Sequence, residues 1–304
     1  MSIDNLVRKI KEKGNPSVAG LDPKIDYVPE YIRKKAYAEY GKNLRGAAEA
    51  VWEFNKGLID ALYDVVPAVK PQSAFYEMYG LEGEEILHRT VKYAREKGLY
   101  VILDVKRNDI GSTAEAYSRA YLGKVEIEGT LVDACPVDCV TVNPYLGTDG
   151  IAPFVNDCKE YDKAIFALVK NSNPSSGELQ DKLIGDKHLF ELVAEKVNDW
   201  NADTIGESGY GAVGAVVGAT YPEQAEILRK IMPHSYFLVP GYGAQGGGAK
   251  GVLPCFNADG LGAIVNSSRG IMCAYKKGDW REEQFAEAAR CEALRMKDDI
   301  TGVL

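Results

Sequence analysis

The sequence predicts an α/β fold, a single-domain (β/α)8 TIM barrel, and two observations support this prediction. Short apolar runs recur eight times along the 304-residue chain, at 17–22, 65–70, 99–106, 139–145, 164–170, 214–219, 236–241 and 263–268. Each run is continuous rather than alternating, which is typical of strands that are buried on both faces of a parallel sheet. Helical patterns lie between the runs, and eightfold strand–helix alternation indicates a closed barrel.

Two of the expected helices have clear periodicity. Apolar residues recur every three to four positions across 44–62, where Asn55 is the polar exception, and again across 189–200. The run Thr220–Glu223 predicts a capping box with a proline in the first helical turn. The alternative architecture is an open doubly wound sheet, and it is weakened because no G-x-G-x-x-G follows the first strand.

Two segments exceed a minimal barrel. One insertion follows strand 1, at 23–40, and the other follows strand 5, at 171–212, with a helix of its own. Both follow the carboxyl ends of strands, where barrel enzymes build their active sites, so they are lids or decorations of that face. We expect residues 1–304 to form one domain, since no repeat or linker interrupts the pattern.

Composition and charge argue against several classes of function. The formal net charge is −8 and no long basic run occurs, which disfavours a nucleic-acid-binding face or an anionic-membrane anchor. No apolar run reaches membrane-spanning length, and the charged start of the chain lacks the apolar region of a signal peptide. The six cysteines form no C-x-x-C pair, so reduced thiols in a cytoplasmic protein are expected.

Polar residues stand where the predicted strands end. Those positions hold Asp22, Lys70, Asp104 with Lys106, Asn143, Asn171 with Ser172, Thr220, Gly241, and Ser268 with Arg269. A single charge in such an apolar context is often an ordinary structural ion pair. Four of them in one barrel mouth, namely Lys70, Asp104, Lys106 and Asp109, instead indicate an active site.

The spacing within 104–109 supports that interpretation. Residues two apart in a strand face the same way, so Asp104 and Lys106 both point into the barrel mouth. Asp109 follows the strand, in the turn, where it approaches Lys106 or reaches a neighbouring subunit. An alternating array of lysines and aspartates holds each ammonium and each carboxylate in its charged form.

A phosphate site is indicated separately after strands 7 and 8. The glycines of 240–251 let backbone N–H groups approach an anion closely, and 266–270 adds further amides and the guanidinium of Arg269. Barrels frequently bind phosphate between these two loops. The alternative is a flexible glycine-rich loop without a ligand. The three histidines are scattered and have no metal-ligand spacing, so we expect no metal site.

These motifs resemble those of a known enzyme family. The run 103–113, LDVKRNDIGST, is similar to the D-x-K-x-x-D-I-x-x-T signature of orotidine 5'-phosphate decarboxylases. The resemblance extends from 20–23 to 267–270, and 68–77 with 171–176 is similar to the bacterial subgroup with longer chains. The D-x-K-x-x-D core alone is shared with sugar-phosphate enzymes of the same superfamily. Its combination with Lys70, Ser172 and Arg269 is far more specific.

The resemblance implies a cofactor-independent carboxy-lyase that converts orotidine 5'-phosphate to UMP in pyrimidine biosynthesis, as a homodimer with shared sites. It implies catalytic roles for Lys70, Asp104, Lys106 and Asp109, with Lys106 protonating C6. It implies substrate contacts by Asp22 and Thr113 with ribose, Ser172 with the pyrimidine, and Gly241, Gln245, Ser268 and Arg269 at the phosphate end. Asp109 and Thr113 are expected to reach the partner's site.

Two other functions remain open at this point. One is a metal-dependent sugar-phosphate decarboxylase or synthase of the same superfamily, although such enzymes usually carry an acidic residue in place of Lys70. The other is a catalytically inactive barrel that binds a nucleotide as a sensor, which would not need the alternating charge array.

Overall fold

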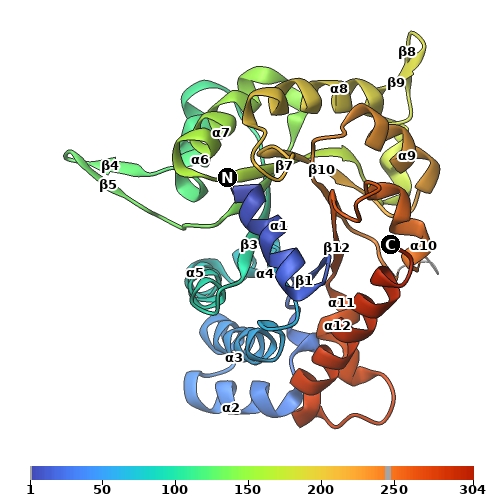
Figure 1. Cartoon of the computed structure of the whole chain (residues 1–304). Coiled ribbons are helices and arrows are strands. Elements are labelled where there is room, and N and C mark those ends of the chain that lie inside the picture. The colour runs from blue at the N-terminus through green and yellow to red at the C-terminus, as the bar shows by residue number, and fades with distance from the viewer. Residues whose placement is uncertain (1, 244–247) are drawn as a thin grey trace.

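The computed structural model describes residues 2–243 and 248–304. Eight parallel strands close into a barrel in the order β1-β12-β11-β10-β7-β6-β3-β2, which confirms the predicted fold (Figure 1). The barrel strands are β1 (Ser17–Leu21), β2 (Ala68–Pro71), β3 (Tyr100–Arg107), β6 (Cys139–Val142), β7 (Ala164–Lys170), β10 (Val213–Val217), β11 (Phe237–Val239) and β12 (Ala263–Ser267).

Helices surround the barrel and connect its strands (Figure 1). They are α1 (Ser2–Lys13), α2 (Glu30–Tyr40), α3 (Leu44–Leu62), α4 (Ala74–Glu77), α5 (Gly80–Glu96), α6 (Gly111–Tyr121), α7 (Thr148–Tyr161), α8 (Leu189–Asn201), α9 (Pro222–Ile231), α10 (Ala249–Val252), α11 (Arg269–Met272) and α12 (Phe285–Thr301). Among the described residues, no helix combines the length and the apolar character needed to cross a membrane.

Two apolar clusters hold the barrel together. The outer one lies between the strands and the surrounding helices, and the inner one fills the barrel with residues such as Tyr100, Phe166 and Leu238. Apolar residues of α1 join the inner cluster, and Ser2 Oγ lies 2.8 Å from the hydroxyl of Tyr100, the first residue of β3. Helix α1 therefore closes the amino-terminal end of the barrel, opposite the carboxyl ends of the strands.

Each barrel strand overlaps one of the predicted apolar runs, and the observed and predicted segments differ only at their ends. The runs at 65–70 and 236–241 are longer than the strands Ala68–Pro71 and Phe237–Val239, because flanking residues pack as loops. Helices α3 and α8 confirm the two periodic segments. Asn55, the polar exception in α3, is buried and donates to the Tyr76 hydroxyl at 2.9 Å.

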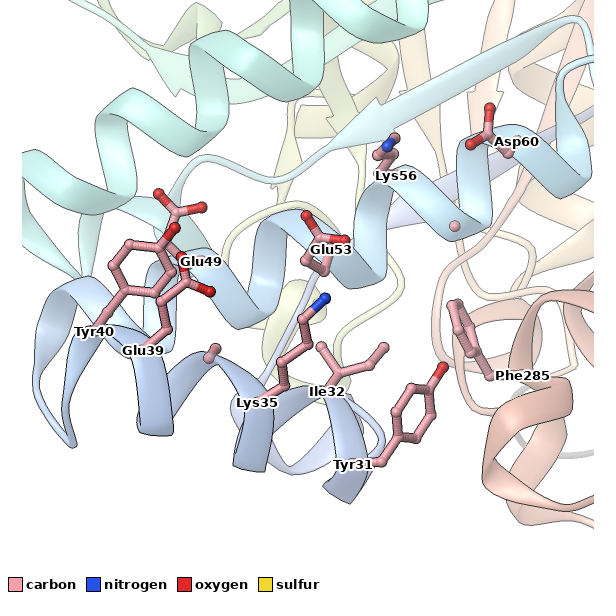
Figure 2. A pocket seen from close by; sticks show the side chains of 12 residues that line it. Tyr31, Ile32, Lys35, Glu39, Tyr40, Glu49, Glu53, Lys56, Asp60 and Phe285 are labelled. Carbon is pink, nitrogen blue, oxygen red and sulfur yellow. The ribbon is translucent and has the colours of Figure 1, made fainter.

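Both predicted insertions have secondary structure. Residues 23–40 form the 3-10 turn Ile25–Tyr27 and helix α2, which packs on α3. A groove of about 310 Å³ runs between these two helices and Phe285, and Figure 2 shows Lys35, Glu53 and Lys56 along it. Residues 171–212 contain the 3-10 helix Pro174–Glu178, the short hairpin β8 (Leu183–Ile184) with β9 (Lys187–His188), α8, and the 3-10 turn Ala202–Thr204.

Two features differ from the sequence-based expectations. The hairpin β4 (Val125–Ile127) with β5 (Thr130–Val132) was not predicted, and it projects from the barrel after α6 (Figure 1). The capping box at Thr220–Glu223 was wrong. Helix α9 begins at Pro222, with Tyr221 at the N-cap and no side-chain cap bond, so only the proline marks the start of the helix.

Candidate active site

Two lysines and one aspartate form the centre of the site at the carboxyl ends of β2 and β3. Lys70 Nζ lies 2.9 Å from Asp104 Oδ2, and Lys106 Nζ lies 2.6 Å from Asp104 Oδ1. Thr141, on the neighbouring strand β6, donates its hydroxyl to Asp104 Oδ1 at 2.7 Å. The carboxylate of Asp104 is thus held by three side chains from three adjacent strands.

Burial and charge together set the ionisation of this group. Burial alone would raise the pKa of the Asp104 carboxyl, but the ammonium groups of Lys70 and Lys106 outweigh it and hold that pKa well below its usual range. Burial alone would lower the pKa of Lys70, but Asp104, and after it Asp22, raise it above its ordinary value. Asp104 and Lys70 are therefore charged at neutral pH.

The backbone at Lys106 is strained. Its φ of 48° lies in the left-handed region, where a residue with a side chain costs about 1–3 kcal/mol. The pairing of β3 with β6 shifts register here, between Leu103 and Arg107. Thr141 Oγ1 accepts a hydrogen bond from the Lys106 backbone N–H at 3.0 Å. The same hydroxyl therefore holds the bent backbone of Lys106 and the carboxylate of Asp104.

A cavity of about 230 Å³ opens beside this group. Its lining includes Lys70, Asp104, Lys106 and Ser172, together with an apolar floor of Leu168, Val216, Leu238 and Pro240. A small cavity lined by apolar side chains and a few charged and polar ones suits a small heteroaromatic ring.

Glycine at 218 allows Ser172 to reach this cavity. A Cβ at Gly218 would lie 2.9 Å from the backbone and side chain of Ser172, closer than real Cβ contacts allow. The residue that follows β10 at this point must therefore lack a side chain.

A second cavity, of about 720 Å³, lies at the ends of β1, β11 and β12. It is lined by Asp22, Gly241, Ser268 and Arg269, four of the predicted binding residues, and by Asn266. Within the described part of the chain, Asp22 Oδ1 and Asn266 Oδ1 are buried without a hydrogen-bond partner. Buried acceptors without donors are rare, and both of these atoms belong to residues that line this cavity.

The two predicted residues that follow β3, Asp109 and Thr113, line neither cavity. Asp109 Oδ1 accepts from the Ile110 backbone N–H at 2.8 Å, and it makes no ion pair with Lys106 among the described residues. Thr113 is exposed in the first turn of α6. Gln245 lies outside the described residues. No group of three His, Cys, Asp or Glu side chains that could hold a metal occurs in 2–243 and 248–304.

Sequence reasoning missed two residues of the site. Thr141 is one of four residues in a short buried strand, and a threonine there is also a common strand former, so nothing in the sequence distinguished it. Asn266 had a weak signal, because it is a polar residue inside the apolar run 263–268. Asn266 and Ser268 lie against Gly20, where a Cβ would clash with both side chains.

Comparisons with known proteins agree with this geometry. The family model described as "Orotidine 5'-phosphate decarboxylase / HUMPS family" matches residues 49–282. An orotidine 5'-phosphate decarboxylase of Caldicellulosiruptor bescii is 43% identical over 301 residues, which cover 99% of this chain and 98% of that protein. This near full-length match confirms the expected likeness to the bacterial proteins.

Solved structures give the same result. The OMP decarboxylase of Leishmania donovani superimposes with a TM-score of 0.75 at 30% identity, covering 99% of this chain and 98% of that one. The UMP synthase of the same organism gives a TM-score of 0.76 at 32% identity, and here the chain spans only 56% of the longer protein. The chain belongs to the orotidine 5'-phosphate decarboxylase / HUMPS family.

Proposed function

We propose that this protein converts orotidine 5'-phosphate to UMP and carbon dioxide, in de novo pyrimidine biosynthesis. The observation that carries the proposal is the array of Lys70, Asp104 and Lys106 beside an apolar cavity, within a chain whose full-length relatives carry the name of this decarboxylase. A site for nucleotide binding alone does not require a buried carboxylate between two ammonium groups.

The two lysines are suited to different tasks. The side chain of Lys70 is 6% exposed and is fixed against Asp104, whereas that of Lys106 is 46% exposed. Lys106 is therefore the ammonium that reaches a bound ring. When the bond from C6 to the carboxylate breaks, its electron pair stays on C6 in the plane of the ring. We assign to Lys106 the proton that C6 then receives, with carbon dioxide as the leaving group.

Catalysis of this kind is mainly electrostatic. The charge on C6 develops in an orbital that the ring π-system cannot delocalise, so preorganised charges must stabilise it. One ammonium at ~4 Å, at an effective dielectric of about 20, contributes roughly 4 kcal/mol. Enzymes typically lower barriers by ~8–23 kcal/mol, so Lys106 alone does not suffice. The rest comes from the remaining array, exclusion of water and the phosphate contacts.

The second cavity supplies those phosphate contacts. Arg269, Ser268 and Gly241 are assigned to the phosphate and Asp22 to a ribose hydroxyl, while the phosphate role of Gln245 rests on the sequence alone. Binding energy obtained at the phosphate, remote from C6, offsets the cost of placing a carboxylate beside Asp104.

We further propose a cytoplasmic homodimer built from one barrel domain per chain. Asp109 and Thr113 lie outside the cavities of their own chain, which is what residues that complete a partner's site require. All six cysteines are free, as is usual in a reducing compartment.

The direct test is an activity assay with EDTA present. Purified protein and orotidine 5'-phosphate should lose the orotate-ring absorbance and yield UMP. Lys106→Ala should lose nearly all turnover while keeping its thermal unfolding transition, and turnover within tenfold of the unchanged protein would refute the role of Lys106. A folded protein that binds UMP without turnover would favour a nucleotide sensor. Turnover of sugar phosphates that requires Mg²⁺ would favour the metal-dependent relatives.

A further inference from the structure

Lys170 is a buried lysine outside the catalytic array. It is the last residue of β7, and its side chain is 1% exposed. Its Nζ lies 2.7 Å from Asp181 Oδ1, donates to Ser176 Oγ at 3.3 Å, and stands 4.7 Å from the centre of the Tyr221 ring. Its partners Ser176 and Asp181 both belong to the insertion after β7, so the lysine ties that insertion to the barrel.

Segment 171–181, which Lys170 holds, forms a wall between two cavities. On one side is the cavity of about 230 Å³ with the catalytic lysines, and on the other is a largely apolar hollow of about 700 Å³ against α8. Asn171 and Asn173 line both. Where the segment faces either cavity it has few side-chain packing contacts, so polar contacts contribute more to its position.

Polar contacts hold the wall at its two ends instead. At one end, the Lys170 carbonyl accepts from the Gly218 backbone N–H at 2.8 Å, where the pairing of β7 with β10 shifts register. At the other end, Asp181 binds Lys170 and accepts from Gln224 Nε2 at 3.3 Å. Between them, Gln180 Oε1 accepts from the Asn171 backbone N–H at 2.9 Å. The contacts of Lys170 and Asn171 lie next to Ser172 in the chain, and those of Gln180 and Asp181 close the far end of the segment.

We propose that Lys170 is a positioning residue for base recognition, which holds segment 171–181 so that Ser172 faces the catalytic cavity. The proposal rests on the proposed function, because it takes the occupant of that cavity to be a pyrimidine ring. Lys170 itself touches no substrate. Its ammonium acts through Asp181 and Ser176, which belong to the same segment as Ser172.

The variant Lys170→Met tests this, since it keeps the apolar stem and removes both tethers. Affinity for UMP should fall about three- to tenfold, the equivalent of one neutral hydrogen bond. Affinity for ribose 5-phosphate, which lacks the base, should change less than twofold. In turnover, KM for orotidine 5'-phosphate should rise more than kcat falls. Calorimetry gives both dissociation constants, and a general loosening of the barrel would weaken the two ligands equally.

Ser172→Ala completes a double-mutant cycle. If Lys170 acts through Ser172, the double variant binds UMP no more weakly than Ser172→Ala alone, whereas additive losses would overturn the proposal. The matched control is Lys163→Met at the other end of β7, where Nζ donates to the Val137 carbonyl at 2.8 Å. That change should lower the stability of the protein without changing the ratio of the dissociation constants for UMP and ribose 5-phosphate.

Two further outcomes are decisive. If Lys170→Met does not fold, Asp181→Ala removes the acceptor of the Lys170 tether from the partly exposed side of the wall, and it must likewise weaken UMP binding more than ribose 5-phosphate binding. Equal losses for both ligands in that variant would overturn the proposal. Failure of the unchanged protein to bind UMP would refute the proposed function and this inference together. If the unchanged protein binds UMP normally but the variants lose no more affinity for UMP than for ribose 5-phosphate, this inference alone is refuted.

Discussion

Removing the hydroxyl of Thr141 tests directly whether this side chain holds the charge array of Lys70, Asp104 and Lys106 in place. The hydroxyl donates to Asp104 Oδ1 at 2.7 Å and accepts from the Lys106 backbone N–H at 3.0 Å. Thr141→Val keeps the shape of the side chain and removes both contacts. Because Thr141 is 1% exposed, water cannot easily replace the lost hydroxyl.

The expected magnitude follows from the two contacts. A hydrogen bond to a charged acceptor contributes about 1.5–3 kcal/mol, and the partly buried Lys106 N–H left without an acceptor costs at most the ~1–3 kcal/mol of a fully buried one. The free energy of unfolding should therefore fall by about 2–5 kcal/mol, since such losses are not fully additive. The left-handed backbone of Lys106 would also relax and move its ammonium, and a misplacement of about 1 Å can cost ~100-fold in rate. We expect kcat to fall by about 10- to 100-fold.

Urea unfolding and steady-state kinetics with orotidine 5'-phosphate measure the two effects. Thr141→Ser is the matched control, because it keeps the hydroxyl and should retain most of the activity. A Thr141→Val protein with kcat within twofold of the unchanged protein, and an unfolding free energy within 0.5 kcal/mol, about the scatter of ordinary surface substitutions, would show that the hydroxyl does not hold the array.

Three further predictions concern the phosphate, the interface and the pH dependence. Arg269→Ala should weaken UMP binding by about 1.5–3 kcal/mol, as expected for a lost charge-assisted contact, and unchanged binding in calorimetry would refute the phosphate assignment. Mixing inactive Asp109→Ala and Lys106→Ala subunits should regenerate some active sites, and no recovery after proven subunit exchange would count against shared sites. The depressed pKa of Asp104 means that its stabilising effect is complete above its ordinary value of 3.8 and is lost as the pH falls through the lower folded value. The difference in stability between the unchanged protein and Asp104→Asn should therefore be constant from about pH 5 to 7 and shrink below about pH 4, and a difference that does not narrow in acid would contradict the ion pairs with Lys70 and Lys106.

The barrel was predictable because its signal is repeated and physically simple. Strands buried on both faces are continuously apolar, and the sequence contains eight such apolar runs. The hairpin of β4 and β5 contains no such run, because its residues are exposed and its strands have three residues each. Its turn places Glu128 and Gly129 at positive φ, and Glu–Gly is a weaker turn signal than Asn–Gly or Asp–Gly.

The charged part of the site was predictable for a related reason. Asp104 and Lys106 are charged residues at the end of a long apolar run, and alternation along a strand directs both to one side. Thr141 and Gly218 could not be identified in this way. The hydroxyl matters because the Lys106 backbone and the Asp104 carboxylate both contact it, and the glycine because Ser172, after the adjacent strand β7, approaches it. Both depend on contacts between segments far apart in the chain.

Lys70 and Lys170 show where reasoning from the sequence stops. Each lysine lies at the carboxyl end of an apolar strand, so the local sequence signal is the same for both, and each is buried and pairs with an aspartate. What differs is the position of the aspartate. Asp104 lies on the adjacent strand β3 and lines the catalytic cavity, so its pair with Lys70 is part of the reacting site. Asp181 lies in the insertion that follows β7, so its pair with Lys170 fixes a wall of that site. The same residue type in the same context is assigned to chemistry in one case and to positioning in the other, and only the partner's place in the fold separates the two.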